Sequence, residues 1–173
     1  CIPWDADNPN DVKAVAIQDQ LLNTLFLDAV FKGTYPKAAL DSIQKYDPSF
    51  RPAPDEMALL AAQKPDFLGV NFYAPADVKS DAASPMSTSW LGNDPDTAVH
   101  SNNGPVRPEY LYKLLMRVKK EYGNPLMMIT ENGAGFAGED IKEGNTVKDP
   151  LRADYITRHI AAASVAYWRD MTC

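Results

Sequence analysis

Two short apolar segments, each set between helical patterns, constrain the fold of this chain more than any other feature. Residues 66–73 are rich in aromatic and β-branched side chains and lie between Pro65 and Pro75, which is typical of a buried strand. Residues 126–130 predict a second buried strand, which runs directly into Glu131. Because helices are predicted before, between and after the two strands, the pattern indicates βαβ units and a parallel sheet.

The predicted sheet is too small to stand alone. Two strands cannot close a parallel sheet, and parallel strands need cover on both faces. The chain also begins at Cys1 without an initiator Met and ends after a helical pattern that lacks a stop signal. We therefore expect an α/β fold in which residues 1–173 form a single, incomplete domain of a longer protein.

The helices are predicted from apolar residues at helical spacing and from capping residues. They cover residues 9–31, 37–46, 55–63, 108–123 and 149 onward, with Asp149 as the N-cap of the last. The predicted buried faces are Val15, Leu22, Leu25, Phe26, Ala29 and Val30 in the first helix, and Tyr155, Ile156, Ile160, Ala163 and Tyr167 in the last. Residues 74–107 show no period, and we expect a long loop that is either disordered or a functional rim, with the rim favoured.

Composition excludes several classes of function. The 23 acidic residues outnumber the 17 Lys and Arg residues, and the net charge of -6 argues against nucleic acid as a partner. No apolar run approaches the roughly 18 residues of a membrane span, so no membrane partner is expected. Neither metal-ligand spacing nor a phosphate-binding glycine motif occurs, so we expect no metal and no cofactor. The compartment stays open, with the cytoplasm favoured.

Chemistry is expected where the two strands end, because parallel α/β folds place their sites beyond the carboxyl ends of strands. The first strand ends in Asn71 and Tyr73, and the second ends in Glu131. By alternation, Glu131 should share a side with Met127 and Ile129. If the strands are neighbours, Tyr73 and Glu131 meet at one mouth, where a phenol donating to a carboxylate would orient it as a nucleophile.

Each of these residues also has a purely structural interpretation. Glu131 precedes Asn132-Gly133, an ordinary turn signal, and is then a solvated side chain at a strand end. Tyr73 alone is more often a packed aromatic residue. His159 fits a half-buried helix histidine, and Glu139 fits a solvated loop residue.

The order of several local patterns resembles family 1 glycoside hydrolases, the β-glucosidase family. The patterns are Pro65-Asp66-Phe67-Leu68-Gly69-Val70-Asn71-Phe72-Tyr73, Glu121-Tyr122-Gly123-Asn124-Pro125 and Ile129-Thr130-Glu131-Asn132-Gly133. The segment from Leu25 to Pro36 and the set Asp149, Arg152, Tyr155 and His159 also fit. The likeness covers nearly the whole chain and thins between residues 76 and 106.

The resemblance implies strands 6 and 7 of a (β/α)₈ TIM barrel with their flanking helices. It implies a retaining hydrolase of terminal β-glucosides in which Glu131 forms a covalent glycosyl-enzyme, Tyr73 orients Glu131, and Asn71 helps to order the sugar. The family's acid lies in an Asn-Glu-Pro segment, which this sequence lacks, so the acid/base is expected outside the chain. Glucosides, galactosides and 6-phospho-glycosides all remain open as substrates.

Two alternatives belong to different classes. In the first alternative, the chain alone is a catalytically inactive fragment that self-associates, or complements a missing half-barrel, through exposed strand edges. In the second alternative, it is a complete, small α/β binding module.

Overall fold

The computed structural model describes residues 1–84, 87–91, 99–139 and 141–168, and within them the chain forms two compact units. The first unit comprises residues 1–66 and 76–91, and the second comprises residues 67–75 and 92–173. That both belong to one barrel domain remains a prediction. In the part of the chain that the structure describes, no helix has the length and apolar character needed to cross a membrane.

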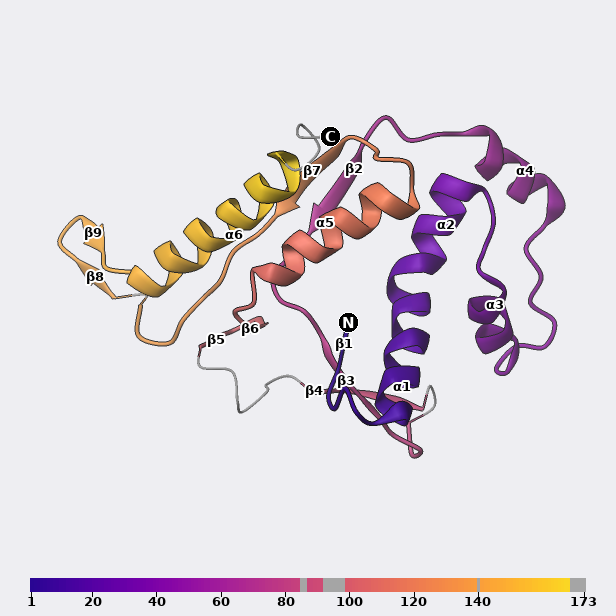
Figure 1. Ribbon diagram of the computed structural model, residues 1–173, viewed down its shortest axis with the longest axis horizontal. Helices are drawn as coiled ribbons and strands as arrows, with labels where there is room; N and C mark the ends of the chain where they lie inside the picture. Colours follow the sequence, from indigo (N-terminus) through magenta and orange to yellow (C-terminus); the bar gives the residue numbers. More distant parts are fainter. Residues whose placement is uncertain (85–86, 92–98, 140, 169–173) are drawn as a thin grey trace. The chain divides into compact units, whose positions relative to one another are not determined.

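A long, continuous helical segment follows the short N-terminal strand of the first unit (Figure 1). It consists of α1 (Pro9–Asp19), the π-helical turn η1 (Gln20–Thr24) and α2 (Leu25–Lys32). The Asn8 side chain accepts the backbone N–H of Asn10 at 3.0 Å, and Pro9 occupies the first helical position, which needs no donor. The predicted helix is thus confirmed, with a π-helical turn inside it that apolar spacing does not reveal.

Gly33 ends α2 and permits a close helix contact. Its φ of 69° lies in the left-handed region that favours glycine, and a Cβ there would lie 2.5 Å from the Ala61 Cα. Ala61 belongs to α4 (Pro54–Ala62), which follows α3 (Lys37–Gln44). Both short helices match their predicted ranges to within two residues.

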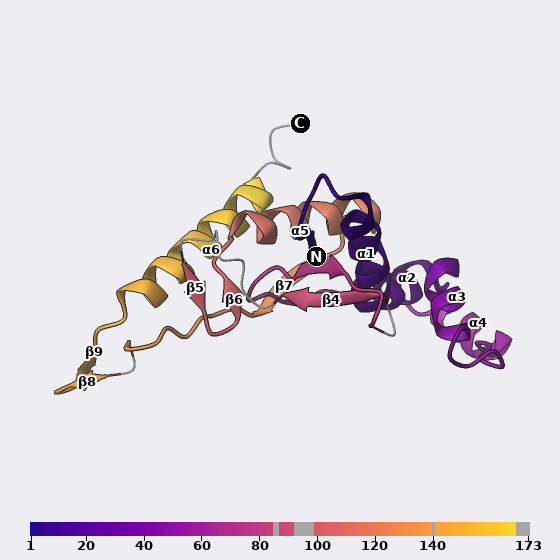
Figure 2. The ribbon, with the colours of Figure 1, turned by 90° about the horizontal axis from the view of Figure 1, so that it is seen from below.

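The first unit also holds a three-stranded sheet in the order β1-β3-β4. Strand β1 (Ile2–Pro3) runs parallel to β3 (Asp77–Ser80), and β3 runs antiparallel to β4 (Thr88–Leu91), the strand labelled in Figure 2. The buried carboxylate of Asp11 joins α1 to this sheet by accepting the Ser80 backbone N–H at 2.8 Å. That hydrogen bond is the main cause of an Asp11 pKa below its ordinary value.

The expectation of an irregular loop over residues 74–107 is therefore wrong in part. Besides β3 and β4, the segment contains β5 (His100–Ser101) and β6 (Gly104–Pro105), which pair antiparallel in the second unit. These strands have two to four residues, too few for a period to be recognised. Residues 85–86 and 92–98 of the predicted rim lie outside the described residues.

The second unit is built on a pair of parallel strands. Strand β2 (Leu68–Asn71) pairs with β7 (Met127–Glu131), and α5 (Glu109–Glu121) and α6 (Pro150–Trp168) run alongside them (Figure 1). A small hairpin of β8 (Lys142–Glu143) and β9 (Thr146–Val147) precedes α6. The helix–strand order predicted for this part is confirmed.

The core of the second unit covers only one face of the strand pair. It consists of Val70, Phe72, Leu111, Leu115 and Ala166, with Leu68, Met127 and Ile129 packed against them. Residues that alternate with these are exposed, Phe67 by 50% and Met128 by 56%. The prediction of fully buried strands is wrong for this chain, because the structure covers one face and leaves the other open.

The predicted helix faces also need correction. In α6 the buried residues are Tyr155, His159 and Ala166, whereas Ile156, Ile160 and Tyr167 are exposed. In the first helical segment Leu22, Phe26 and Val30 are exposed. Apolar spacing identifies a stripe on a helix, but it does not say which part of the stripe a neighbour covers.

The start of α6 is held by a residue that we expected to be solvated. Glu139 is buried, and its two carboxylate oxygens accept the backbone N–H groups of Leu151 at 2.9 Å and Arg152 at 3.1 Å. A carboxylate placed there satisfies free helix donors and opposes the helix dipole. Asp149 directly precedes the helix, as predicted, and its carbonyl accepts the Ala153 N–H at 3.0 Å, while its side chain forms an ion pair with Arg152 at 2.7 Å.

Candidate active site

The carboxyl ends of β2 and β7 lie side by side, and a β-bulge shapes the place where they end. The pairing runs regularly to Val70 opposite Ile129, and then Asn71 lies opposite Glu131. Thr130 is therefore the extra residue of β7. Such a bulge interrupts the strict alternation of side chains and re-aims the residues that follow it.

The bulge corrects the predicted side of Glu131. Strict alternation would place Glu131 with Met127 and Ile129, which pack against the core next to the helices. Instead Glu131 lies beside Asn71 and contacts Tyr73, on the open side of the strand pair. A one-residue irregularity cannot be recognised in a five-residue apolar segment, so sequence alternation gave the wrong partners.

Thr130 also lies on this open side. A Cβ at Gly69 would stand 3.2 Å from the Thr130 Cγ2, so glycine leaves the space that the threonine side chain fills. The Thr130 hydroxyl donates to the Asn71 Oδ1 at 2.7 Å. Asn71 is thereby held at the mouth, and its side chain is exposed.

The structure brings Tyr73 and Glu131 into direct contact, with the phenol donating a hydrogen bond to the Glu131 Oε2. This hydrogen bond, which a phenolate would lose, is the main reason that the pKa of Tyr73 is raised above its ordinary value. Both side chains are exposed. The result is a solvent-accessible carboxylate whose orientation is fixed by a neutral phenol.

A second tyrosine, which the sequence placed in an apolar face and in the family pattern without a role at the mouth, supports the two strand ends. The fully buried Tyr155 of α6 donates its hydroxyl to the Tyr73 backbone carbonyl at 2.6 Å. The same hydroxyl accepts the Asn132 Nδ2 at 3.1 Å, and Asn132 also donates to the Phe72 carbonyl at 2.8 Å. Burial is the main cause of a raised pKa for Tyr155. Helical spacing signals that Tyr155 is buried, but not where its hydroxyl points.

His159 lies one turn further along α6 and is buried rather than half-buried. Its ring stacks on that of Tyr155 with centroids 3.8 Å apart, and its Nδ1 donates to the Tyr155 carbonyl at 2.7 Å. The Nε2 is buried and has no hydrogen-bond partner within the residues that the structure describes. Burial lowers the pKa of His159, which favours the neutral ring, and its contacts with Tyr155 are those of a packed side chain.

No cluster of three or more potential metal ligands occurs in the described residues. The side chains that meet at the mouth are the Glu131 carboxylate, the Tyr73 phenol and the Asn71 amide. An oriented carboxylate at the carboxyl ends of parallel strands is the usual place and form of a catalytic group in barrel enzymes. Fold and site thus define a parallel α/β unit with an exposed, oriented carboxylate at the carboxyl ends of its strands.

The comparison with known families identifies the chain more closely. The model for glycosyl hydrolase family 1 matches residues 1–172, and the chain belongs to this family. Membership confirms the resemblance drawn from the sequence motifs.

Individual relatives agree with this assignment. The chain is 38% identical to a β-glucosidase A from Enterobacter agglomerans over 83% of its own length and 30% of the relative's. It is 30% identical to a 6-phospho-β-galactosidase from Staphylococcus aureus over 91% of its length and 39% of the relative's. The chain therefore spans roughly a third of the curated relatives that it matches.

A solved structure gives the architecture. The crystal structure of a β-glucosidase from Exiguobacterium marinum superimposes with a TM-score of 0.83 at 30% identity, covering 97% of this chain and 37% of the other. The chain is thus part of a (β/α)₈ barrel, as the resemblance implied. Within the second unit, β2 and β7 correspond to the expected strand pair.

Proposed function

We propose that this chain is the nucleophile-bearing part of a retaining β-glycosidase, and that Glu131 attacks the anomeric carbon of terminal β-glucosides. The observation that carries the proposal is the hydrogen bond from Tyr73 to Glu131 at the carboxyl ends of two parallel strands. Family membership supports it, and so do the relatives whose names include β-glucosidase.

The proposed reaction has two displacements. In the first, a Glu131 carboxylate oxygen bonds to the anomeric carbon while the bond to the leaving oxygen breaks and an acid protonates that oxygen. In the second, water attacks the same carbon, the ester to Glu131 breaks, and the former acid takes the proton from the water. Two inversions return the starting configuration.

Tyr73 and Asn71 have supporting roles in this proposal. By donating to one carboxylate oxygen, Tyr73 leaves the other oxygen for the attack and limits rotation of the carboxylate. Asn71 has its Oδ1 engaged by Thr130, which leaves its amide N–H groups to donate to a sugar hydroxyl.

The acid/base residue is proposed to come from outside this chain. The sequence holds no Asn-Glu-Pro segment, and a retaining pair requires a second carboxyl group about 5–5.5 Å from the nucleophile. The loss of a general acid commonly costs about 10²–10⁴ in rate. We therefore expect the isolated chain not to hydrolyse aryl β-glucosides measurably.

The sugar is proposed to be glucose because several relatives are named β-glucosidases. The 6-phospho-β-galactosidases of Staphylococcus aureus, at 30% identity, set the competing substrate class. Parallel assays of aryl β-glucoside and aryl 6-phospho-β-galactoside with a complete barrel that contains this chain decide between them.

Azide rescue tests the role of Glu131 in the same complete barrel. Glu131→Gly removes the carboxylate and leaves space for a small anion, so the variant should be inactive in buffer and regain turnover of an activated β-glucoside with azide. The product should be the α-glycosyl azide, because only one displacement then occurs. Glu143→Gly, at an exposed carboxylate paired with Lys148, is the matched control and should keep activity without azide. A variant that keeps its activity without azide, or a glycosyl azide of β configuration, would refute the assignment.

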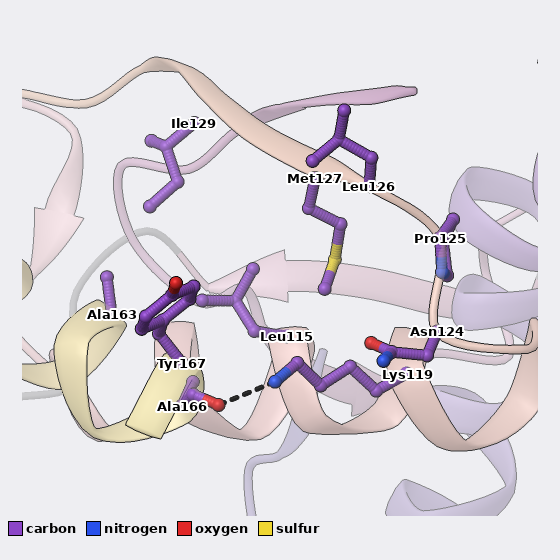
Figure 3. Close-up of a pocket in the computed structure, with 10 residues that line it drawn as sticks. All are labelled: Leu115, Lys119, Asn124, Pro125, Leu126, Met127, Ile129, Ala163, Ala166 and Tyr167. Carbon is purple, nitrogen blue, oxygen red and sulfur yellow. Dashed lines mark hydrogen bonds between the residues drawn. The ribbon is translucent and has the colours of Figure 1, made fainter. Parts of the chain in front are cut away.

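A second candidate function is complementation by the chain alone. Within the described residues β7 pairs only with β2, and a groove of about 620 Å³ lies between β7, α5 and α6. Met127 and Leu115 reach into this groove, and Lys119 spans one end by donating to the Ala166 carbonyl at 2.6 Å (Figure 3). Its lining is mainly apolar.

The occupant that we propose for this groove is the remainder of a barrel, because the chain covers only 37% of a solved family member and an open strand edge invites pairing. Mixing the chain with a separately expressed remainder should yield a one-to-one complex with glucosidase activity. A concentration-dependent dimer of the chain alone, without binding of the remainder, would instead indicate self-association.

A further inference from the structure

We infer that Tyr155 is a positioning residue, whose buried hydroxyl holds the ends of β2 and β7 in the register that keeps Tyr73 on Glu131. The inference deepens the proposed function, since it assigns to α6 a part in shaping the same site. The oxygen of this one side chain is hydrogen-bonded to both strand ends.

The contacts of the hydroxyl divide between the two strand ends. Toward β2, it donates to the backbone carbonyl of Tyr73 itself at 2.6 Å. Toward β7, it accepts the side-chain amide of Asn132 at 3.1 Å. Asn132 directly follows Glu131 in the chain. The hydroxyl therefore ties the backbone of Tyr73 to the residues that immediately follow Glu131.

The strand ends need such a tie because the ladder itself is irregular there. The bulge at Thr130 ends the regular pairing of the two strands. Beyond the bulge, the Phe72 N–H donates a backbone hydrogen bond to the Glu131 carbonyl at 2.9 Å. The Asn132 amide adds a link to the Phe72 carbonyl. Tyr155 completes this set from the helix side.

Tyr155 is itself rigidly held. It is fully buried, stacks on His159 at 3.8 Å, and packs with Val106 and Phe136. The ring is fixed, and its hydroxyl both donates and accepts a hydrogen bond. Such a hydroxyl restricts the positions of its partners more than an exposed side chain would. The position of Tyr73 is thus set from the opposite side of the strands to the one on which it meets Glu131.

The test follows the titration of Tyr73 in the 173-residue chain by NMR of ¹³Cζ-labelled tyrosines, with Tyr73→Phe to assign the signal. Tyr155→Phe deletes only the hydroxyl, and we expect the titration of Tyr73 to move down toward the ordinary tyrosine value near 10. Tyr167→Phe makes the same change at an exposed position of the same helix and should leave Tyr73 unchanged.

If Tyr155→Phe does not fold, Asn132→Ala removes the other half of the link and should shift Tyr73 in the same direction. A folded variant of either kind with an unchanged Tyr73 titration overturns the inference. In a complete barrel, Tyr155→Phe should lower kcat by on the order of 10- to 100-fold with little change in KM. The NMR result does not depend on catalysis, so a failure of the glycosidase proposal would leave it standing.

Discussion

Thr130 packs over Gly69 at the mouth, where a Cβ on Gly69 would lie 3.2 Å from the Thr130 Cγ2 and 3.3 Å from its Oγ1. The threonine is the bulged residue of β7, and its hydroxyl holds Asn71. The absence of a side chain on one strand thus makes room for the irregularity that turns Glu131 toward Tyr73.

Substitution at Gly69 should therefore disturb the bulge. Gly69→Ala requires Thr130 to move by tenths of an ångström and should be tolerated, whereas Gly69→Val should destabilise the chain by about 1–3 kcal/mol through overpacking. Urea unfolding of both variants measures the difference. The double variant Gly69→Val with Thr130→Ser, which removes the nearest methyl group, should recover part of the loss. Equal stability of Gly69→Val and wild type would contradict the packing account.

Tyr73→Phe should lower kcat in a complete barrel by about 10- to 100-fold, because the carboxylate loses the donor that orients it. KM should change much less, since the proposed role of the phenol is to orient the nucleophile and not to bind the sugar. Initial-rate kinetics with an activated aryl glucoside measure both constants, and Tyr46→Phe, at an exposed tyrosine of the first unit, is the control. A variant with full kcat would mean that Glu131 is oriented by something else.

Acid should destabilise the chain through His159. Its pKa is lowered by burial, so the folded state binds this proton less readily than the unfolded state does. The contribution of the neutral His159 ring to stability is fully present above the pKa of the unfolded state, near 6.5. It is lost as the pH falls through the pKa of the folded state.

His159→Gln, which retains an amide donor, should flatten the decline in unfolding free energy below pH 6.5 relative to wild type. Denaturant titrations of both proteins at a series of pH values provide the comparison. An identical decline in the two proteins would exclude His159 as the source.

Alkali should act in the opposite sense through Tyr73. Its pKa is raised, chiefly by the hydrogen bond that it donates to Glu131. The contribution of this hydrogen bond to stability is complete below the tyrosine pKa of the unfolded state, near 10. It is lost as the pH rises through the Tyr73 pKa of the folded state. Tyr73→Phe should therefore lose less stability than wild type above pH 10. A steeper loss of stability in the variant than in wild type would show that the direction assigned to the Tyr73 pKa shift is wrong.

Glu139→Gln should lower the stability of α6, because it removes a buried negative charge that accepts two backbone N–H groups at the helix start. The expected loss is about 0.5–2 kcal/mol. Glu143→Gln replaces an exposed carboxylate in the same loop and should change stability little. Thermal unfolding followed by circular dichroism tests the pair, and equal midpoints would argue against the capping role.

The order of the elements could be predicted because their signals are local. Pro9, Gly33 and Pro150 mark helix ends in the sequence and in the structure, and the strand that ends in Asn71 has a composition that no helix would favour. Family motifs supplied the place of these elements in a barrel, since two strands alone do not specify one.

What could not be predicted depends on contacts between distant residues. The bulged Thr130 packs over Gly69, which lies far earlier in the chain, and the bulge places Glu131 on the other side of β7 from the one that alternation predicts. Glu139 became a helix cap and Tyr155 a link between strand ends only once the fold brought their partners near. Burial of His159 likewise depends on the ring stacked on it.

Labelling with a 2-deoxy-2-fluoro β-glucoside that carries an activated leaving group is the most direct test of Glu131 as nucleophile. Fluorine at C2 slows both displacements by destabilising the oxocarbenium-like transition state, while the good leaving group lets the first proceed, so the glycosyl-enzyme accumulates. In a complete barrel that contains this chain, trypsin should release the labelled peptide 121–142. Because that peptide also contains Glu121 and Glu139, tandem mass spectrometry must place the sugar. A single fluoroglucosyl group on Glu131 is the predicted result, and a label on any other residue would contradict it.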